Sequence, residues 1–400
     1  MSKTWEERQV SLGGAIIASV VTLVAGVLIG INWTSISSNF LPYLGFQSTS
    51  TNNWTELDEV YSLLNSRFDG DLDKSLLLEG AKRGLVEAAD DVYTVYMSSA
   101  EASDYEASLH GEVGAGIGVE MGLRDGYVRV LRTLPDNPAR QAGVKAGDII
   151  YKVDDEEVYS KTTEYISTKL RGEAGSSVKL TVVRDGEEKS FTLTRELINN
   201  VSAYVDYNGN TATITVTRFD SDTGTLIQKF VADDFAAKGV KNVILDLRNN
   251  GGGYVDAAKD LLSLWINGDT VLIQKDKHGR ETTTRANRGQ AELANIPTVV
   301  VVNNSTASAS EIVAGALKDY GKATIIGERT YGKGVVQTLF DLTGGSLLKI
   351  TTARWYTPYG TSINGEGITP DLEVERTFED INLSRDPQLD AAKNHLASGA

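Results

Sequence analysis

Apolar residues recur at two different spacings along the N-terminal half of the chain. Between residues 54 and 100 they return every three or four positions, in runs that start at Leu57 and at Leu76. This spacing is typical of amphipathic helices. From Gly114 to about Arg195, short β-branched runs alternate with Gly and Asp turns, as in a small β-rich domain. The pattern therefore predicts a helical arm followed by a β module.

The C-terminal half alternates strand and helix patterns. Val243 to Leu247 and Thr298 to Val302 are nearly uninterrupted apolar runs, as in strands that are covered on both faces. Helical patterns follow them over 254–266 and from about Ser308 to Tyr320. This alternation predicts an α/β core that contains several parallel strands.

The first long apolar run lies near the N-terminus. Residues 12–31 carry no charge, and twenty helical residues span roughly 30 Å, the thickness of the hydrocarbon core of a bilayer. We interpret the run as a transmembrane anchor; a cleaved signal peptide is the alternative, although its apolar part is usually shorter. Lys3 and Arg8 favour a cytoplasmic N-terminus, residues 1–11, and an extracytoplasmic body. Residues 32–53 then serve as a polar linker.

Composition excludes several classes of function. The net charge of −15 disfavours a general nucleic-acid binder. With no cysteine, the chain has no disulfides, iron–sulfur clusters or thiol nucleophiles. His110, His278 and His395 are the only histidines and lack a metal-ligand spacing, so we expect neither a metal nor a cofactor. A nucleophile in this chain must use a base other than histidine.

One candidate nucleophile lies between a predicted buried strand and a predicted helix. The segment Ser305 to Glu311 contains Ser308 at the expected helix N-terminus, where N–H groups favour developing negative charge. Ser308 and Glu311 also match a capping box, which by itself requires no catalytic role. Ser308 is therefore a candidate that depends on a partner elsewhere.

The candidate base follows 25 positions later, at Lys333. The surrounding Gly327 to Gly334 matches the spacing of a phosphate-binding loop, but Gly334 replaces the required Ser or Thr and a strand pattern follows instead of a helix. We expect Lys333 and Gln337 to lie on one strand face, within hydrogen-bonding reach of each other. A lysine acts as a base only when burial lowers its pKa toward about 7–8.

Four separated motifs resemble those of the carboxyl-terminal processing (tail-specific) peptidase family, and the likeness extends over residues 55–395. The motifs are Ser305 to Glu311, Gly332-Lys333-Gly334-x-x-Gln337, Asp246 to Asn250 followed by Gly252-Gly253, and Tyr356-Thr357-Pro358 with Gly367-Ile368-x-Pro370-Asp371. The resemblance implies a serine peptidase with an α/β, crotonase-like core of mixed sheet and helices.

The resemblance also implies roles for individual residues. Ser308 corresponds to the nucleophile, Lys333 to the general base and Gln337 to the residue that positions the lysine. The oxyanion is then bound by backbone N–H groups, for which the candidates are Ala309, Gly252 and Gly253. Gly251 and Val92 stand where the family more often has proline.

The β module resembles a circularly permuted bacterial PDZ domain. The carrying segments are Gly116-Ile117-Gly118-Val119, Pro138-Ala139, Ala142-Gly143-Val144 and Gly147-Asp148-Ile149-Ile150. Such domains bind protein C-termini at a sheet edge, with the terminal carboxylate on glycine-loop N–H groups. Gly116, Ile117, Gly118 and Val119 are the corresponding residues here. A structural β-barrel insert is the alternative.

The expected organisation follows from these segments. The arm covers residues 54–110 and serves packing or homodimerisation, the PDZ domain covers 111–197, the peptidase core covers 198–376 and a helical segment covers 377–400. The expected function is endopeptidase cleavage of protein substrates with exposed C-termini. Two alternatives are a catalytically silent membrane-tethered PDZ scaffold and a non-proteolytic acyl-transfer enzyme, because one fold supports many reactions.

Overall fold

A computed structural model describes most of the chain, namely residues 19–24, 26–27, 54–109, 111, 114–124, 126–198, 200–383 and 385–399. It divides into two units, residues 1–78 and 79–400, each described by itself below. Most of the predicted anchor at 12–31 lies outside the described residues; 19–24 and 26–27 are helical. In the described part, no helix is long and apolar enough to cross a membrane.

Two helices confirm the spacing of the N-terminal arm. They are α3 (Thr55–Arg67) and α4 (Lys74–Glu87). The arm continues into a short strand, β1 (Val95–Met97), and a further helix, α5 (Ser99–Leu109). Through β1 the arm joins a sheet of the C-terminal body, because β1 pairs antiparallel with β18 (Leu347–Tyr356).

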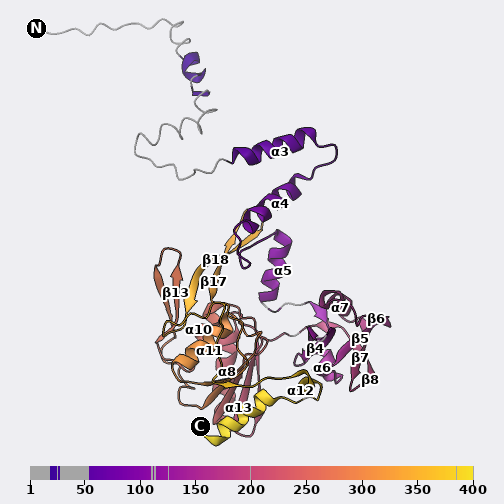
Figure 1. Cartoon of the computed structure of the whole chain (residues 1–400), viewed down its shortest axis with the longest axis vertical. Helices are drawn as coiled ribbons and strands as arrows, with labels where there is room; N and C mark the ends of the chain where they lie inside the picture. Colours follow the sequence, from indigo (N-terminus) through magenta and orange to yellow (C-terminus); the bar gives the residue numbers. More distant parts are fainter. Residues whose placement is uncertain are drawn as a thin grey trace, which may run out of the picture. The chain divides into compact units, whose positions relative to one another are not determined.

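The β module is an antiparallel sheet with two short helices (Figure 1). Its apolar cluster includes Val130, Ile150, Ile166 and Leu180, all fully buried. A separate two-stranded antiparallel ladder joins the start of the module to its end. The elements are β2 (Ala115–Gly116) with β9 (Glu196–Leu197), the path β3 (Val119–Arg124), β4 (Tyr127–Thr133), β5 (Ile149–Val153), β7 (Ser177–Arg184) and β8 (Glu187–Thr194), β6 (Glu156–Glu157) beside β5, and the helices α6 (Pro138–Gln141) and α7 (Thr163–Leu170).

The C-terminal half contains the predicted α/β core. Its main sheet has the order β10-β11-β12-β15-β16-β19, in which only the first pair is antiparallel. Burial on both faces explains the uninterrupted apolar runs of β12 and β15. The strands are β10 (Ala203–Asn208), β11 (Thr211–Val216), β12 (Asn242–Asp246), β15 (Thr298–Val302), β16 (Thr324–Gly327) and β19 (Leu372–Glu373).

Helices cover both faces of this sheet, and a second sheet lies beyond one helical layer (Figure 1). The predicted helix 254–266 is shorter, because the chain leaves it at Leu262 and Trp265 packs in the core instead. The helices on one side are α8 (Thr223–Phe230), the π-helical turn Val231–Phe235, α9 (Ala236–Lys238), α10 (Val255–Leu262) and α11 (Ala309–Asp319). The second sheet contains β13 (Thr270–Asp276), β14 (Glu281–Arg285), β17 (Val335–Asp341) and β18, together with β1. After α12 (Phe378–Asn382), the last helix α13 (Pro387–Ser398) packs on the other face.

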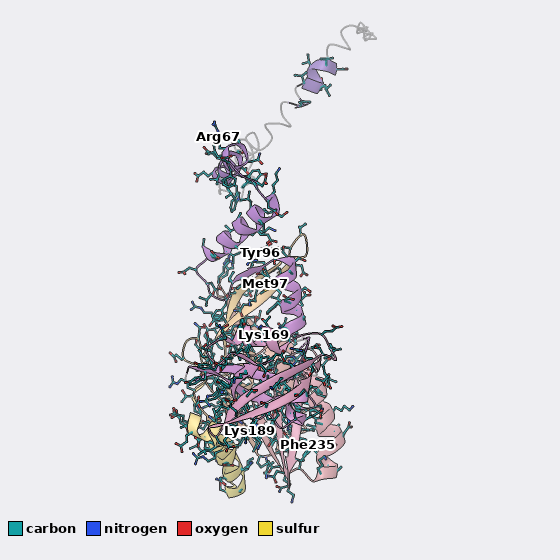
Figure 2. The ribbon with its side chains drawn as sticks, turned by 90° about the vertical axis from the view of Figure 1, so that its right-hand side faces the viewer. Arg67, Tyr96, Met97, Lys169, Lys189 and Phe235 are labelled. Atoms are coloured by element: carbon teal, nitrogen blue, oxygen red, sulfur yellow. The ribbon has the colours of Figure 1, made fainter. Side chains whose placement is uncertain are left out.

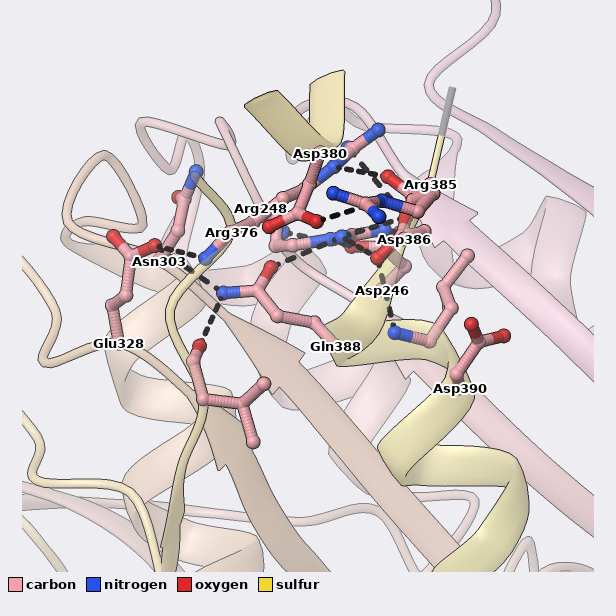
Figure 3. Close-up of polar contacts among 12 residues, drawn as sticks. Asp246, Arg248, Asn303, Glu328, Arg376, Asp380, Arg385, Asp386, Gln388 and Asp390 are labelled. Carbon is pink, nitrogen blue, oxygen red and sulfur yellow. Dashed lines mark hydrogen bonds and ion pairs between the residues drawn. The ribbon is translucent and has the colours of Figure 1, made fainter. Parts of the chain in front are cut away.

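A buried ionic cluster ties α13 to the carboxyl end of β12 (Figure 3). Arg248 donates to Asp246 at 2.6 Å, to Asp386 at 2.9 Å and to Gln388 at 3.1 Å. Burial alone lowers the pKa of Arg248, but the two carboxylates raise it above its usual value. Burial raises the pKa of Asp386, yet Arg248 and Arg376 hold it below its usual range.

We expect Asp386→Ala to destabilise the protein by about 1–3 kcal/mol at pH 7, because Arg248 loses one of its charged acceptors. A depressed carboxyl pKa stabilises the fold above the unfolded value of about 3.9 and ceases to do so as pH falls through the folded value. The difference between variant and wild type should therefore shrink below about pH 4 in denaturant titrations. Asp390→Ala, which alters an exposed carboxylate on the same helix, is the control. Equal losses of stability in the two variants would contradict a stabilising role for the ionic cluster.

Candidate active site

Ser308 lies at the turn between β15 and α11, as predicted. Its backbone has φ 57° and ψ −119°, a conformation that L-residues rarely adopt. The N–H of Ser308 donates to Glu311 Oε2 at 2.9 Å, which confirms that part of the capping box. The turn thus holds the Ser308 backbone in a strained conformation at a helix N-terminus, where positive partial charge gathers.

The Glu311 carboxylate is completely buried and joins this turn to the lysine segment. Besides the Ser308 N–H, its oxygens accept three hydrogen bonds: from Thr330 Oγ1 at 2.5 Å, from Gly332 N at 2.7 Å and from Lys333 N at 2.9 Å. A buried carboxylate needs such donors to offset the loss of water. The sequence indicated Glu311 as a helix cap but did not reveal this second set of partners, because they follow it by about twenty positions.

Lys333 lies just before β17, and its carbonyl accepts a hydrogen bond from Trp355 Nε1 at 2.8 Å. Burial lowers the pKa of the Lys333 amine, and the positive charge of Lys349 lowers it further, whereas Glu311 acts in the opposite direction. A lowered pKa is what a lysine requires to act as a general base near neutral pH. In the described part of the chain, no hydrogen bond joins Lys333 Nζ to Ser308 Oγ.

Gln337 does not share a regular strand with Lys333. β17 begins at Val335, so Lys333 lies outside the strand that carries Gln337, and the expectation that both lie on this strand was wrong. The register shift beside Gln337 passes over Thr352, an extra residue of β18. Gln337 Nε2 instead donates to Thr351 Oγ1 at 3.2 Å, on the neighbouring strand β18. The role of Gln337 in positioning the lysine stays a prediction.

The glycine turn after β12 lies directly against the candidate nucleophile. A Cβ atom at Gly252 would be 2.7 Å from Ser308 Cβ, so only glycine fits there. The Gly252 N–H donates to Asn250 Oδ1 at 2.9 Å. Among the predicted oxyanion donors, Ala309 and Gly253 therefore remain as candidates, since the Gly252 N–H is occupied in this structure.

The predicted peptide-binding residues Gly116 to Val119 line a cavity of about 310 Å³. Arg132, Glu120 and Arg171 also border the cavity; Arg132 is ion-paired with Glu120, whereas the positive charge of Arg171 suits a carboxylate. The Ile117 carbonyl already accepts a hydrogen bond from Ala139 N at 2.9 Å, and its side chain is buried in the module. The site thus combines apolar lining with basic side chains.

The described residues contain no group of three or more His, Cys, Asp and Glu side chains that could hold a metal ion. The structure brings together a strained serine at a helix N-terminus and a partly buried lysine with a lowered pKa. The Glu311 carboxylate accepts hydrogen bonds from the backbone N–H groups of both residues. The class of protein that these features indicate is a serine hydrolase.

Comparisons with known families agree with this class. Residues 210–374 match the model of peptidase family S41, and residues 115–195 match that of the PDZ domain. Residues 33–101 match the model described as the activating protease CtpB N-terminal domain. The three matches follow the order arm, PDZ domain and core.

Individual proteins are similar over nearly the whole chain. A "Probable CtpA-like serine protease" of Staphylococcus aureus (strain COL) is 33% identical over 95% of this chain and 75% of its own length. Its namesake in Staphylococcus epidermidis is 30% identical, with 96% and 76% covered. The solved structure of a photosystem II D1 C-terminal processing protease is 29% identical, covering 87% of this chain and 92% of that chain, with a TM-score of 0.54.

The chain therefore belongs to peptidase family S41 and is a C-terminal processing peptidase. It is a serine-type endopeptidase that carries a PDZ domain. The silent-scaffold and acyl-transfer alternatives are accordingly disfavoured.

Glu311→Gln should lower kcat by about 100-fold with little change in KM, because an amide cannot accept from all four donors and the Ser308 and Lys333 segments move apart. Steady-state kinetics on a peptide substrate measure both constants. Glu373→Gln, an exposed change on β19, should match the wild type. An unchanged kcat in Glu311→Gln would refute the role of the carboxylate.

Proposed function

We propose that Ser308 and Lys333 form the catalytic dyad of this endopeptidase. The observation that carries the proposal is the Glu311 carboxylate, which accepts hydrogen bonds from the backbone N–H of both residues and so fixes their two segments together. The lowered pKa of Lys333 supports its role as the base. Their side chains are not hydrogen-bonded to each other here, and such contacts often tighten only when substrate binds.

The reaction then follows the usual course of acyl transfer. Neutral Lys333 takes the proton of Ser308 Oγ while this oxygen bonds to the scissile carbonyl carbon. The resulting ammonium gives the proton to the leaving amine as the carbon–nitrogen bond breaks, which leaves an acyl ester on Ser308. Water, deprotonated by the same lysine, hydrolyses the ester and restores the serine.

The oxyanion that forms during attack needs fixed donors, each worth about 3–4 kcal/mol. Ala309 N, at the start of α11, and Gly253 N are the donors that we assign to it. Gly252 contributes by its small size, since any side chain would displace Ser308. Gln337 supports the strand beside the lysine through Thr351.

Substrate tails are bound by the PDZ domain in this proposal. The loop Gly116 to Val119 receives the terminal carboxylate, and Arg171 of the adjoining cavity adds charge attraction. The bound tail extends a sheet edge, which leaves the upstream chain free to reach Ser308. Protein substrates with exposed C-termini follow as the substrate class.

The dyad predicts that Ser308→Ala and Lys333→Met each lower kcat by roughly 1,000-fold or more in a fluorogenic peptide assay. Ser305→Ala, in the same turn, should retain activity because its hydroxyl bonds only to Asn304. Activity in Lys333→Met at the wild-type level would remove the lysine from the mechanism.

In the same assay, amidation of the peptide C-terminus should raise KM about tenfold by removing one charged contact. Equal KM values would refute tail recognition and leave the dyad intact.

We also propose that residues 12–31 anchor the protein in the cell membrane, as a single span with the catalytic body on the extracytoplasmic side. The uncharged length of the run and the basic N-terminal flank support this topology. The chain should stay in the membrane pellet after alkaline carbonate extraction, and protease added outside intact spheroplasts should digest the body. Recovery of the chain in the carbonate supernatant would exclude the span.

A further inference from the structure

A tyrosine of the N-terminal arm covers the amine of Lys333. The Lys333 Nζ atom lies 5.2 Å from the ring centroid of Tyr93, within the range of a cation–π contact. Tyr93 belongs to the turn of residues 91–94, which joins α4 to β1. The arm thus supplies a side chain directly at the proposed base.

Several hydrogen bonds hold this turn in place. Asp91 accepts from Tyr93 N at 3.2 Å and from Thr94 Oγ1 at 2.6 Å. Thr94 Oγ1 in turn accepts from Thr351 N at 3.1 Å, and Thr351 is the residue that binds Gln337. Immediately after the turn, β1 pairs with β18; its residues Tyr96 and Met97 are labelled in Figure 2. These hydrogen bonds and the pairing of β1 with β18 therefore fix the position of Tyr93.

A second pair repeats the arrangement. Tyr105 of α5 lies over Lys349, with its ring centroid 5.1 Å from Nζ. Burial lowers the pKa of Lys349, and the charge of Lys349 is one of the causes that lower the pKa of Lys333. Two arm tyrosines thus cover two lysines of one electrostatic cluster.

The covering ring has two opposite effects on the amine. Its π face stabilises the ammonium. The water that it excludes would also stabilise the ammonium, and burial is the largest of the causes that lower the pKa of Lys333. Exclusion of water therefore outweighs attraction by the ring. The neighbouring Tyr331 raises the pKa of Tyr93 to about 12, so the ring carries no charge at neutral pH.

We propose that Tyr93 is a positioning residue of the active site, through which the docked arm keeps the Lys333 amine dry and ready to act as a base. The proposal rests on the proposed function of Lys333. The charged or titratable groups that act on the amine are Glu311 from α11, Lys349 from β18 and Tyr93 from the arm. Those that act on the Tyr93 ring are Tyr331 from the loop before Lys333, Asp91 from the arm and Glu311. Of these, only Tyr93 and Asp91 are absent when the arm is not docked.

The test measures the pKa of Lys333 directly in the whole chain. The rate of acetylation of Lys333 by acetic anhydride, followed by mass spectrometry from pH 6 to 11, reports this pKa whether or not the lysine is catalytic. Tyr93→Ala admits water and should raise the pKa by about one unit, which also moves the acidic limb of kcat/KM upward and lowers activity about tenfold below the limb. Tyr93→Leu keeps an apolar cover and should shift the pKa less than Tyr93→Ala.

Val92→Ala is the matched control, because Val92 is in the same turn with 84% of its surface exposed. A folding defect would lower the amplitude of activity but leave the pKa in place, so the two effects separate. An unchanged Lys333 pKa in Tyr93→Ala, or equal shifts in the Ala and Leu variants, would overturn the proposal. A shifted pKa in an enzyme whose rate does not follow it would instead refute Lys333 as the base.

Discussion

The proposed active site depends on one buried carboxylate that accepts hydrogen bonds from two chain segments. Glu311 accepts hydrogen bonds from the N–H groups of Ser308 and Lys333, and also from Gly332 and Thr330. A buried carboxylate is costly unless its oxygens are satisfied, so the fold that pairs these segments also stabilises the charge. The same group favours the ammonium form of Lys333, so burial and Lys349 must outweigh it for the amine to be uncharged and able to accept a proton.

The site is completed by parts of the chain that lie far from the catalytic motifs in sequence. The glycine turn after β12 fits against Ser308 because it has no side chain at Gly252. Thr351 of β18 binds both Gln337 and the arm turn. The arm therefore belongs to the environment of the proposed base, in addition to any role in assembly.

The C-terminal helix α13 supports the start of the glycine turn that follows β12. Arg248 follows β12 and leads into the glycine turn, and it is fixed by Asp246 on one side and by Asp386 and Gln388 on the other (Figure 3). In the proposed mechanism this loop presents the Gly253 N–H to the oxyanion, and such a loop gains from rigid support. Sequence motifs pointed to Asp246 and Arg248, but nothing in the sequence indicated their partners on α13.

Local patterns determined much of this protein. Uninterrupted apolar runs predicted β12 and β15, with β15 at its observed bounds, and helical spacing predicted α3, α4 and α11. These predictions succeed because burial on a strand face or helix stripe leaves a period in the sequence. The same patterns also placed Ser308 at a helix N-terminus. The anchor at 12–31 and the domain boundaries stay predictions.

Contacts between distant segments were decided only by the tertiary structure. The pairing of β17 with β18 gave Gln337 a hydrogen-bond partner, Thr351, that the sequence did not indicate. The second role of Glu311 and the cover of Tyr93 over Lys333 arise from segments that meet only after folding. Such contacts leave no period in the sequence, because their spacing along the chain is set by the topology of the sheets rather than by the geometry of one helix or strand.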